Sequence, residues 1–214
     1  MNAIRQSPLL RAAASLLGIT FGIALLYGLR EIEPAPGARS VALHGAFDVT
    51  GHLLTALVIA IGVRALRLPV PLWSILAGGI VLDFGHLLTW LDVAERLHGS
   101  SRNGSHSLIV VAILAVVGFV DRHHAHIWLG VAMGASSHLW RDMGTGTVPL
   151  LWPLTETVYG TLFNRYLAVL GGIVVAMIGT ATLLSLHAQS IDRDHGTPDA
   201  SASLYTGRQE PTRT

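Results

Sequence analysis

Apolar residues along the chain fall into six segments, separated by short polar stretches or by stretches that contain Pro and Gly. None of the segments shows the alternation of period two that is typical of a half-buried β-strand. Each approaches the length of about 20 residues that crosses a bilayer as an α-helix. The segments cover residues 12–29, 47–66, 72–91, 104–120, 127–141 and 166–186. The pattern therefore predicts an all-α polytopic membrane protein, a bundle of about six transmembrane helices.

The same pattern predicts one transmembrane helical domain over residues 1–187 and a polar tail over residues 188–214. The tail is rich in Ser, Thr, Asp and Gly, a composition typical of disorder. The first apolar segment has a second interpretation, a cleaved signal peptide, because small residues and Pro follow it at 34–38. Its length and the later apolar segments favour a retained helix. Arg is slightly more frequent on the side of the predicted membrane domain that holds both termini, which favours a cytoplasmic position for both.

Composition supports the membrane assignment and narrows the chemistry. Charged residues make up 13% of the 214 residues, against about 25% in soluble domains. The formal net charge of +1 gives no indication of nucleic-acid binding. The chain has no Cys, which excludes disulfides, thiolate catalysis and Cys-based zinc sites, but it has eleven His. Imidazole and carboxylate groups are therefore the strong metal ligands available.

The polar residues of the apolar segments share one face of the predicted membrane domain. Six alternating helices place the start of the second and fourth segments, and the end of the third and fifth, at the same face. The residues at these four positions are Asp48, His52, Asp83, His86, His106, His138 and Asp142. Spacings of three or four residues put the members of each pair on one side of a helix. Ionisable residues in a span usually face a bundle interior or an aqueous cavity, so we expect a shared polar site.

This ligand set indicates one or two divalent metal ions. His nitrogen and carboxylate oxygen suit Zn²⁺, with Mn²⁺ and Fe²⁺ as alternatives. The predicted ligands are His52, Asp83, His86, His106, His138 and Asp142, and His44 and Asp48 are additional candidates on the second segment. By contrast, His123, His124 and His126 fall at the opposite face and are interpreted as an interfacial loop.

Three motifs, in their order along the chain, resemble a known family. They are Asp-Phe-Gly-His at 83–86, Arg-Asn-Gly-Ser-His-Ser at 102–107 and Ser-His-Leu-Trp-Arg-Asp at 137–142. Together they are similar to the motifs of the YdjM-like family of bacterial inner-membrane, metal-dependent hydrolases, sometimes described as LexA-binding. The resemblance covers about residues 44–154. Two positions depart from the family pattern, because Gly85 replaces an Asp and Ser105 replaces a Thr.

The resemblance implies a membrane-embedded hydrolase in which a metal activates water, with a lipid or phosphoester as a natural substrate and the bacterial inner membrane as its location. Asp83 and Asp142 are the predicted catalytic carboxylates, and Arg102 is a candidate phosphate-binding group. Arg102 and Arg141 each have two interpretations, phosphate binding and an interfacial side chain. Two other functions stay open: an ion or proton-coupled transporter, and a non-catalytic membrane protein in which the metal is a structural clip.

Overall fold

The computed structural model of the chain describes residues 7–32, 41–83 and 105–195, and all of its regular elements are helices. Within these ranges the only pairing of extended backbone is an isolated bridge between Val148 and Tyr159. The helices are α1 (Pro8–Ile32), α2 (Val41–Ala65), α3 (Leu72–Val81), α7 (Leu108–Val120), α8 (Ala125–Thr145) and α9 (Phe163–His195). The predicted all-α class is therefore confirmed. The described residues form six helices, each at the position of one predicted segment.

Three of the described helices, not six, are long and apolar enough to cross a membrane: α1, α2 from Gly45, and α9. The other three differ for physical reasons. The helix α3 has 10 residues and α7 has 13, which at 1.5 Å per residue is shorter than the bilayer core of about 30 Å. The helix α8 has 21 residues, but it carries several polar and ionisable side chains. The second half of the predicted third segment lies outside the described residues.

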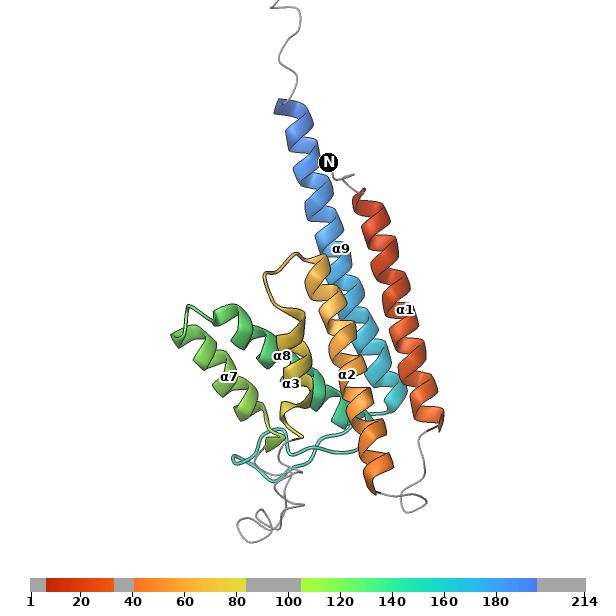
Figure 1. The fold of residues 1–214 in the computed structure, drawn as a ribbon, viewed down its shortest axis with the longest axis vertical. Coiled ribbons are helices and arrows are strands. Elements are labelled where there is room, and N and C mark those ends of the chain that lie inside the picture. Colours follow the sequence, from red (N-terminus) through yellow and green to blue (C-terminus); the bar gives the residue numbers. More distant parts are fainter. Residues whose placement is uncertain (1–6, 33–40, 84–104, 196–214) are drawn as a thin grey trace, which may run out of the picture.

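The helices run alternately up and down, in two groups (Figure 1). The long helices α1, α2 and α9 lie side by side around an apolar core that includes Leu26, Val58 and Leu170. The shorter helices α3, α7 and α8 pack around a second core, made of Leu82, Ala135 and Leu139. A third small cluster joins α2 to α3. The two groups therefore share α2 and α3 as their common boundary.

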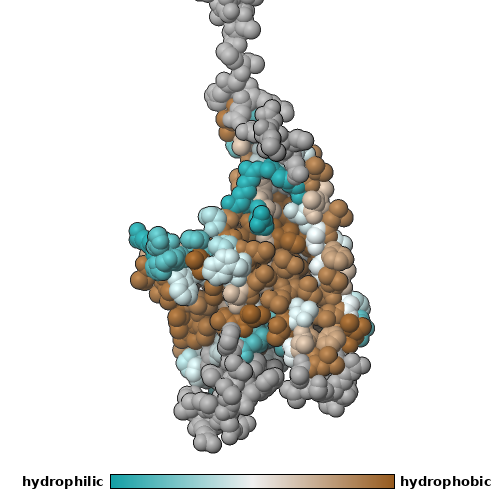
Figure 2. Space-filling view, viewed as in Figure 1, coloured by the Kyte–Doolittle hydropathy of each residue, from teal (hydrophilic) through white to brown (hydrophobic). Residues whose placement is uncertain are grey.

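The outer surface of the bundle is strongly apolar. On the face shown in Figure 2, hydrophobic side chains cover the middle of the molecule, and hydrophilic ones gather over the α2–α3 and α7–α8 connections. On α1, Leu17 is 72% exposed and Phe21 is 65% exposed. Contiguous exposed apolar surface of this extent marks contact with lipid or with another protein, and the lengths of α1, α2 and α9 favour lipid.

The α7–α8 connection is a hydrogen-bonded turn at the left of the view in Figure 1. The carboxylate of Asp121 accepts hydrogen bonds from Trp128 Nε1 at 3.1 Å and from His124 Nδ1 at 3.0 Å. The bonds from Trp128 and His124 hold the pKa of Asp121 below its usual value. His123 and His126 are exposed. These residues lie in the turn before α8 or in its first turn, whereas Asp142 lies in its last turn.

The last helix is longer than the sequence predicts. It continues to His195, so residues 188–195, assigned to the polar tail above, are helical. Residues 196–214 of the predicted disordered tail lie outside the described residues.

Glycines allow the backbones of α3 and α8 to approach closely. A Cβ on Gly134 would lie 2.0 Å from the carbonyl oxygen of Ile75, and a Cβ on Gly78 would lie 2.1 Å from that of Val131. Small residues at helix interfaces are a common device in membrane bundles because they permit such contacts. This packing holds the last turns of α8, which carry His138 and Asp142, against the end of α3.

We predict that Gly134→Ala lowers the melting temperature of the purified protein in detergent. The added methyl group overlaps the α3 backbone, and overpacking of this kind costs about 1–3 kcal/mol. The matched control is Gly179→Ala on α9, where an added Cβ meets no atom within 4 Å. Alanine is favoured over glycine in a helix by about 1 kcal/mol, so the control should melt at an unchanged or higher temperature. Equal melting temperatures for the two variants would contradict the close packing.

Candidate metal centre

Six of the predicted site residues meet at one end of the bundle. Asp48 and His52 lie on α2, Asp83 follows the end of α3, His106 precedes the start of α7, and His138 and Asp142 lie in the last two turns of α8. We call these six residues the His/Asp cluster. Topology alone predicts that they share a face, and the structure places them in contact. Their roles in metal binding and catalysis stay predictions.

The carboxylate of Asp142 lies at the centre of the cluster. Its Oδ1 is 3.3 Å from Nε2 of His52. Its Oδ2 is 3.4 Å from Nε2 of His106 and 3.3 Å from Nε2 of His138. One carboxylate therefore faces imidazole nitrogens from three different elements.

The spacing of three of these atoms suits a metal ion. Nε2 of His106 and Nε2 of His138 are 3.3 Å apart, so with Asp142 Oδ2 they form a triangle with sides of 3.3, 3.3 and 3.4 Å. Tetrahedral ligands at 2.0–2.1 Å from Zn²⁺ lie about 3.3 Å apart. The triangle therefore has the size of one face of a tetrahedral zinc site.

A second set of ligand atoms surrounds His52. Its Nε2 is 3.5 Å from Oδ1 of Asp48 as well as 3.3 Å from Asp142. Three groups of residues have ligand atoms that all lie within 4.8 Å of one another: His52/His138/Asp142, Asp83/His106/His138 and Asp48/His52/Asp83. The two oxygens of Asp142 point to different imidazoles, so the cluster has donors for one ion or for two ions that share this carboxylate.

The Nδ1 atoms of His138 and His106 each have a hydrogen-bond partner that holds the ring in place. Nδ1 of His138 lies 2.9 Å from the carbonyl oxygen of Gly79. A carbonyl only accepts, so Nδ1 donates, and in the neutral ring Nε2 keeps the lone pair that a metal needs. Nδ1 of His106 similarly lies 2.8 Å from the hydroxyl of Ser105. Metal-binding histidines usually have such a partner on the second nitrogen. The bond to Gly79 depends on the close packing of α3 and α8.

Four members of the cluster are almost completely buried, which makes unpaired polar atoms costly there. The exposed fractions of His52 and His138 are both 0%, that of His106 is 1% and that of Asp142 is 8%. The rings of His52 and His138 are stacked, with centroids 3.6 Å apart. Within the described residues, neither ring nitrogen of His52 makes a hydrogen bond. Its Nε2 nevertheless faces the carboxylates of Asp142 and Asp48 at 3.3 and 3.5 Å, so a proton or a metal cation on this nitrogen would satisfy it.

Arg141 forms a buried ion pair with Asp48 of the cluster. Its side chain is 3% exposed, and Nη2 lies 3.7 Å from Oδ1 of Asp48. Gly51 makes room for it, because a Cβ there would lie 2.0 Å from the guanidinium carbon. The contact between Arg141 and Asp48 was not predicted, and the small residue Gly51 between Asp48 and His52 is the one feature of the sequence that indicates space for it. The buried position favours an ion pair over the interfacial side chain considered above.

Three predicted residues are not placed by these contacts. His86 and Arg102 lie outside the described residues. His44 lies on α2, but its side chain is outside the described part of the chain.

Comparisons of the chain with protein-family models, curated proteins and solved structures found no match. The resemblance to the YdjM-like family therefore stays a prediction from the three motifs. The candidate metal centre is supported by the geometry of this chain alone.

We predict that the purified protein binds one or two equivalents of Zn²⁺ and that Asp142→Asn and His138→Ala each abolish stoichiometric binding. Substitutions of outer partners of a metal typically cost 10–100-fold in affinity, and loss of a direct ligand should cost more. Elemental analysis after dialysis measures the content. The matched control is His123→Ala, an exposed histidine in the turn before α8, which should keep the wild-type content. Full metal content in both cluster variants would exclude the site.

Proposed function

We propose that this protein is a membrane-embedded, metal-dependent hydrolase that acts on a lipid or another phosphoester at one face of the membrane. The observation that supports it most is the triangle of His106, His138 and Asp142, which combines the size of a zinc-ligand face with a buried position at the ends of helices. A mixed nitrogen and oxygen donor set without Cys is typical of hydrolytic sites for Zn²⁺, Mn²⁺ or Fe²⁺.

The donor atoms divide naturally between two positions. His106, His138 and Oδ2 of Asp142 would hold one ion, and His52 with Oδ1 of Asp142 would hold a second. When bound, such an ion lowers the pKa of a water molecule toward about 7 and polarises the attacked phosphoryl or carbonyl group.

The carboxylates of the cluster differ in their access to solvent, and we assign roles on that basis. The side chain of Asp142 is 10% exposed and faces three imidazoles, which suits a ligand. The side chain of Asp83 is 17% exposed and that of Asp48 is 30% exposed. A general base needs to reach a proton on water or substrate, so Asp48 and Asp83 are the better candidates. Arg141 would hold the Asp48 carboxylate in a fixed orientation.

The depth of the cluster favours a substrate at the membrane surface. His52 is seven residues beyond Gly45, the start of the apolar span of α2, which corresponds to about 10 Å along the helix axis. The other members lie at helix ends. A transporter site is expected near the middle of the bilayer and between repeated halves. The position toward one end therefore favours hydrolysis of a lipid or phosphoester over transport.

A structural metal clip is the second alternative, and it differs from an enzyme in its coordination. A structural site is closed by four protein ligands, whereas a catalytic site keeps an open position. The partial exposure of Asp48 and Asp83 favours an opening toward solvent.

We predict that the protein loaded with Co²⁺ changes its visible absorption spectrum when azide or phosphate is added, because an open position accepts an external ligand. The same preparation, loaded with Zn²⁺ or Mn²⁺, should hydrolyse phosphoesters in detergent and lose activity with chelator. Asp48→Asn should reduce turnover by about 100-fold or more, the range expected for loss of a general base. Asp142→Asn serves as the control that loses metal and turnover together. A spectrum that no added ligand alters would identify a closed structural site and contradict the proposal.

A further inference from the structure

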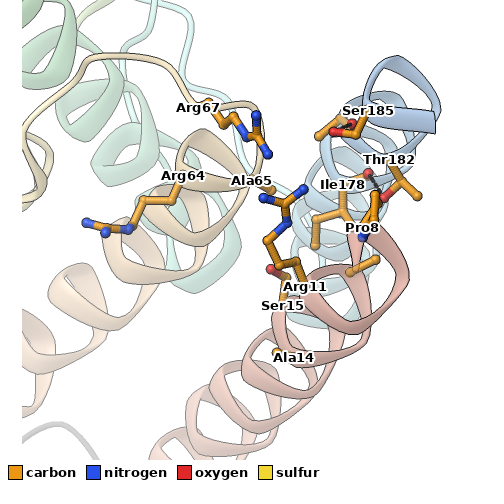
Figure 3. Close-up of a pocket in the computed structure, with 12 residues that line it drawn as sticks. Pro8, Arg11, Ala14, Ser15, Arg64, Ala65, Arg67, Ile178, Thr182 and Ser185 are labelled. Carbon is orange, nitrogen blue, oxygen red and sulfur yellow. Dashed lines mark hydrogen bonds between the residues drawn. The ribbon is translucent and has the colours of Figure 1, made fainter. Parts of the chain in front are cut away.

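Figure 3 shows a cavity of about 250 Å³. It lies beside the end of α2, whereas the His/Asp cluster lies beside the first half of that helix. One water molecule needs about 10–15 Å³ on the same measure, so the space can hold a larger group. Its walls come from the start of α1, the end of α2 and the second half of α9. The polar residues of the lining are Arg11, Ser15, Arg64, Arg67, Thr182 and Ser185. We call this space the arginine cavity.

The charges in the arginine cavity are all of one sign. Figure 3 shows the guanidinium groups of Arg11 and Arg67 turned toward each other across the cavity, whereas that of Arg64 points away. None of the twelve residues that line the cavity is acidic. Arginine stays protonated in proteins, so these guanidinium groups repel each other unless an anion lies between them. Their fork of donors matches the oxygens of a phosphate group.

The end of α2 sets the direction of the Arg67 side chain. Arg67 is the only non-glycine residue with positive φ in the described chain, at 57°. The amide of Leu68 donates to Val63 and that of Arg67 donates to Arg64, which is the hydrogen-bond pattern of a Schellman motif at the end of α2. Glycine is the usual residue at this left-handed position because other residues are strained there. The left-handed residue that ends α2 directs its side chain toward the cavity (Figure 3).

The surroundings favour a lipid headgroup as the source of the anion. The cavity lies between ends of α1, α2 and α9, the three helices that can span a membrane. Beside it, Leu9 on α1 is 64% exposed and Leu183 on α9 is 69% exposed, so acyl chains have an apolar surface next to the charged space. The hydroxyls of Thr182 and Ser185 both donate to backbone carbonyls at 2.8 Å. They therefore offer a ligand their acceptor lone pairs, which suit a headgroup with its own hydroxyls.

We propose that the arginine cavity binds the phosphate of an anionic phospholipid headgroup between Arg11 and Arg67. This site lies at the membrane face opposite to the candidate metal centre, and it does not depend on the proposed hydrolase activity.

The experiment measures phosphatidylglycerol binding to the full-length protein in detergent by native mass spectrometry and by thermal shift. Phosphatidylcholine and inorganic phosphate are tested in parallel. The variants are Arg11→Gln and Arg67→Gly. Glycine relieves the strain at position 67, so Arg67→Gly should melt at the same or a higher temperature without lipid, which separates loss of binding from loss of folding. Arg122→Gln is the matched control, an exposed arginine in the α7–α8 turn that does not line the cavity.

We expect phosphatidylglycerol to bind and to raise the melting temperature of the wild type and of Arg122→Gln, with little effect of phosphatidylcholine. Each cavity variant should bind it about tenfold more weakly, the loss typical of one charge-assisted hydrogen bond. Unchanged binding in both cavity variants would overturn the site. Stabilisation by inorganic phosphate equal to that by the lipid would overturn the assignment to a headgroup.

Discussion

The lower end of the bundle depends on one buried carboxylate. Asp142 is 8% exposed, and an ionised carboxylate at that depth is costly unless opposite charges or hydrogen-bond donors surround it. The chain surrounds it with His52, His106 and His138. Each of these must hold a proton toward the carboxylate or share a cation with it. The bond from His138 to Gly79 orients Nε2 of this ring toward the carboxylate, so a cation shared between Asp142 and the imidazoles is one arrangement that would satisfy the group.

The close packing of α3 against α8 is the condition for this arrangement. Gly78 and Gly134 remove the side chains that would separate the two backbones, and the contact brings the carbonyl of Gly79 within 2.9 Å of His138. On the other side, Gly51 admits the guanidinium group of Arg141 toward Asp48. Three small residues thus position the ligands, although none of them carries any chemistry itself.

The sequence predicts the helical class and the shared face because both follow from long-range features. Apolar segment lengths set the number of helices, and alternation of direction sets which polar ends meet. The closeness of Asp83 to His138 and the stacking of His52 on His138 could not be predicted, because they depend on backbone packing at glycines. The apolar pattern also did not predict the lengths of two helices. The helix α3 ends at Val81, and α9 continues past the apolar run to His195. The arginine cavity was missed because Arg11 and Arg67 are far apart in the sequence and are individually unremarkable.

The two ends of the bundle carry different chemistry, imidazoles and carboxylates at one and arginines at the other, joined by the apolar length of α1, α2 and α9. The central claim is that the imidazole end holds a divalent ion. X-ray absorption spectroscopy of the Zn²⁺-loaded protein tests it most directly. We predict a first shell of nitrogen and oxygen atoms at about 2.0–2.1 Å with the outer-shell scattering of at least two imidazoles, lost in His138→Ala. A shell of oxygen alone, without imidazole scattering, would contradict it.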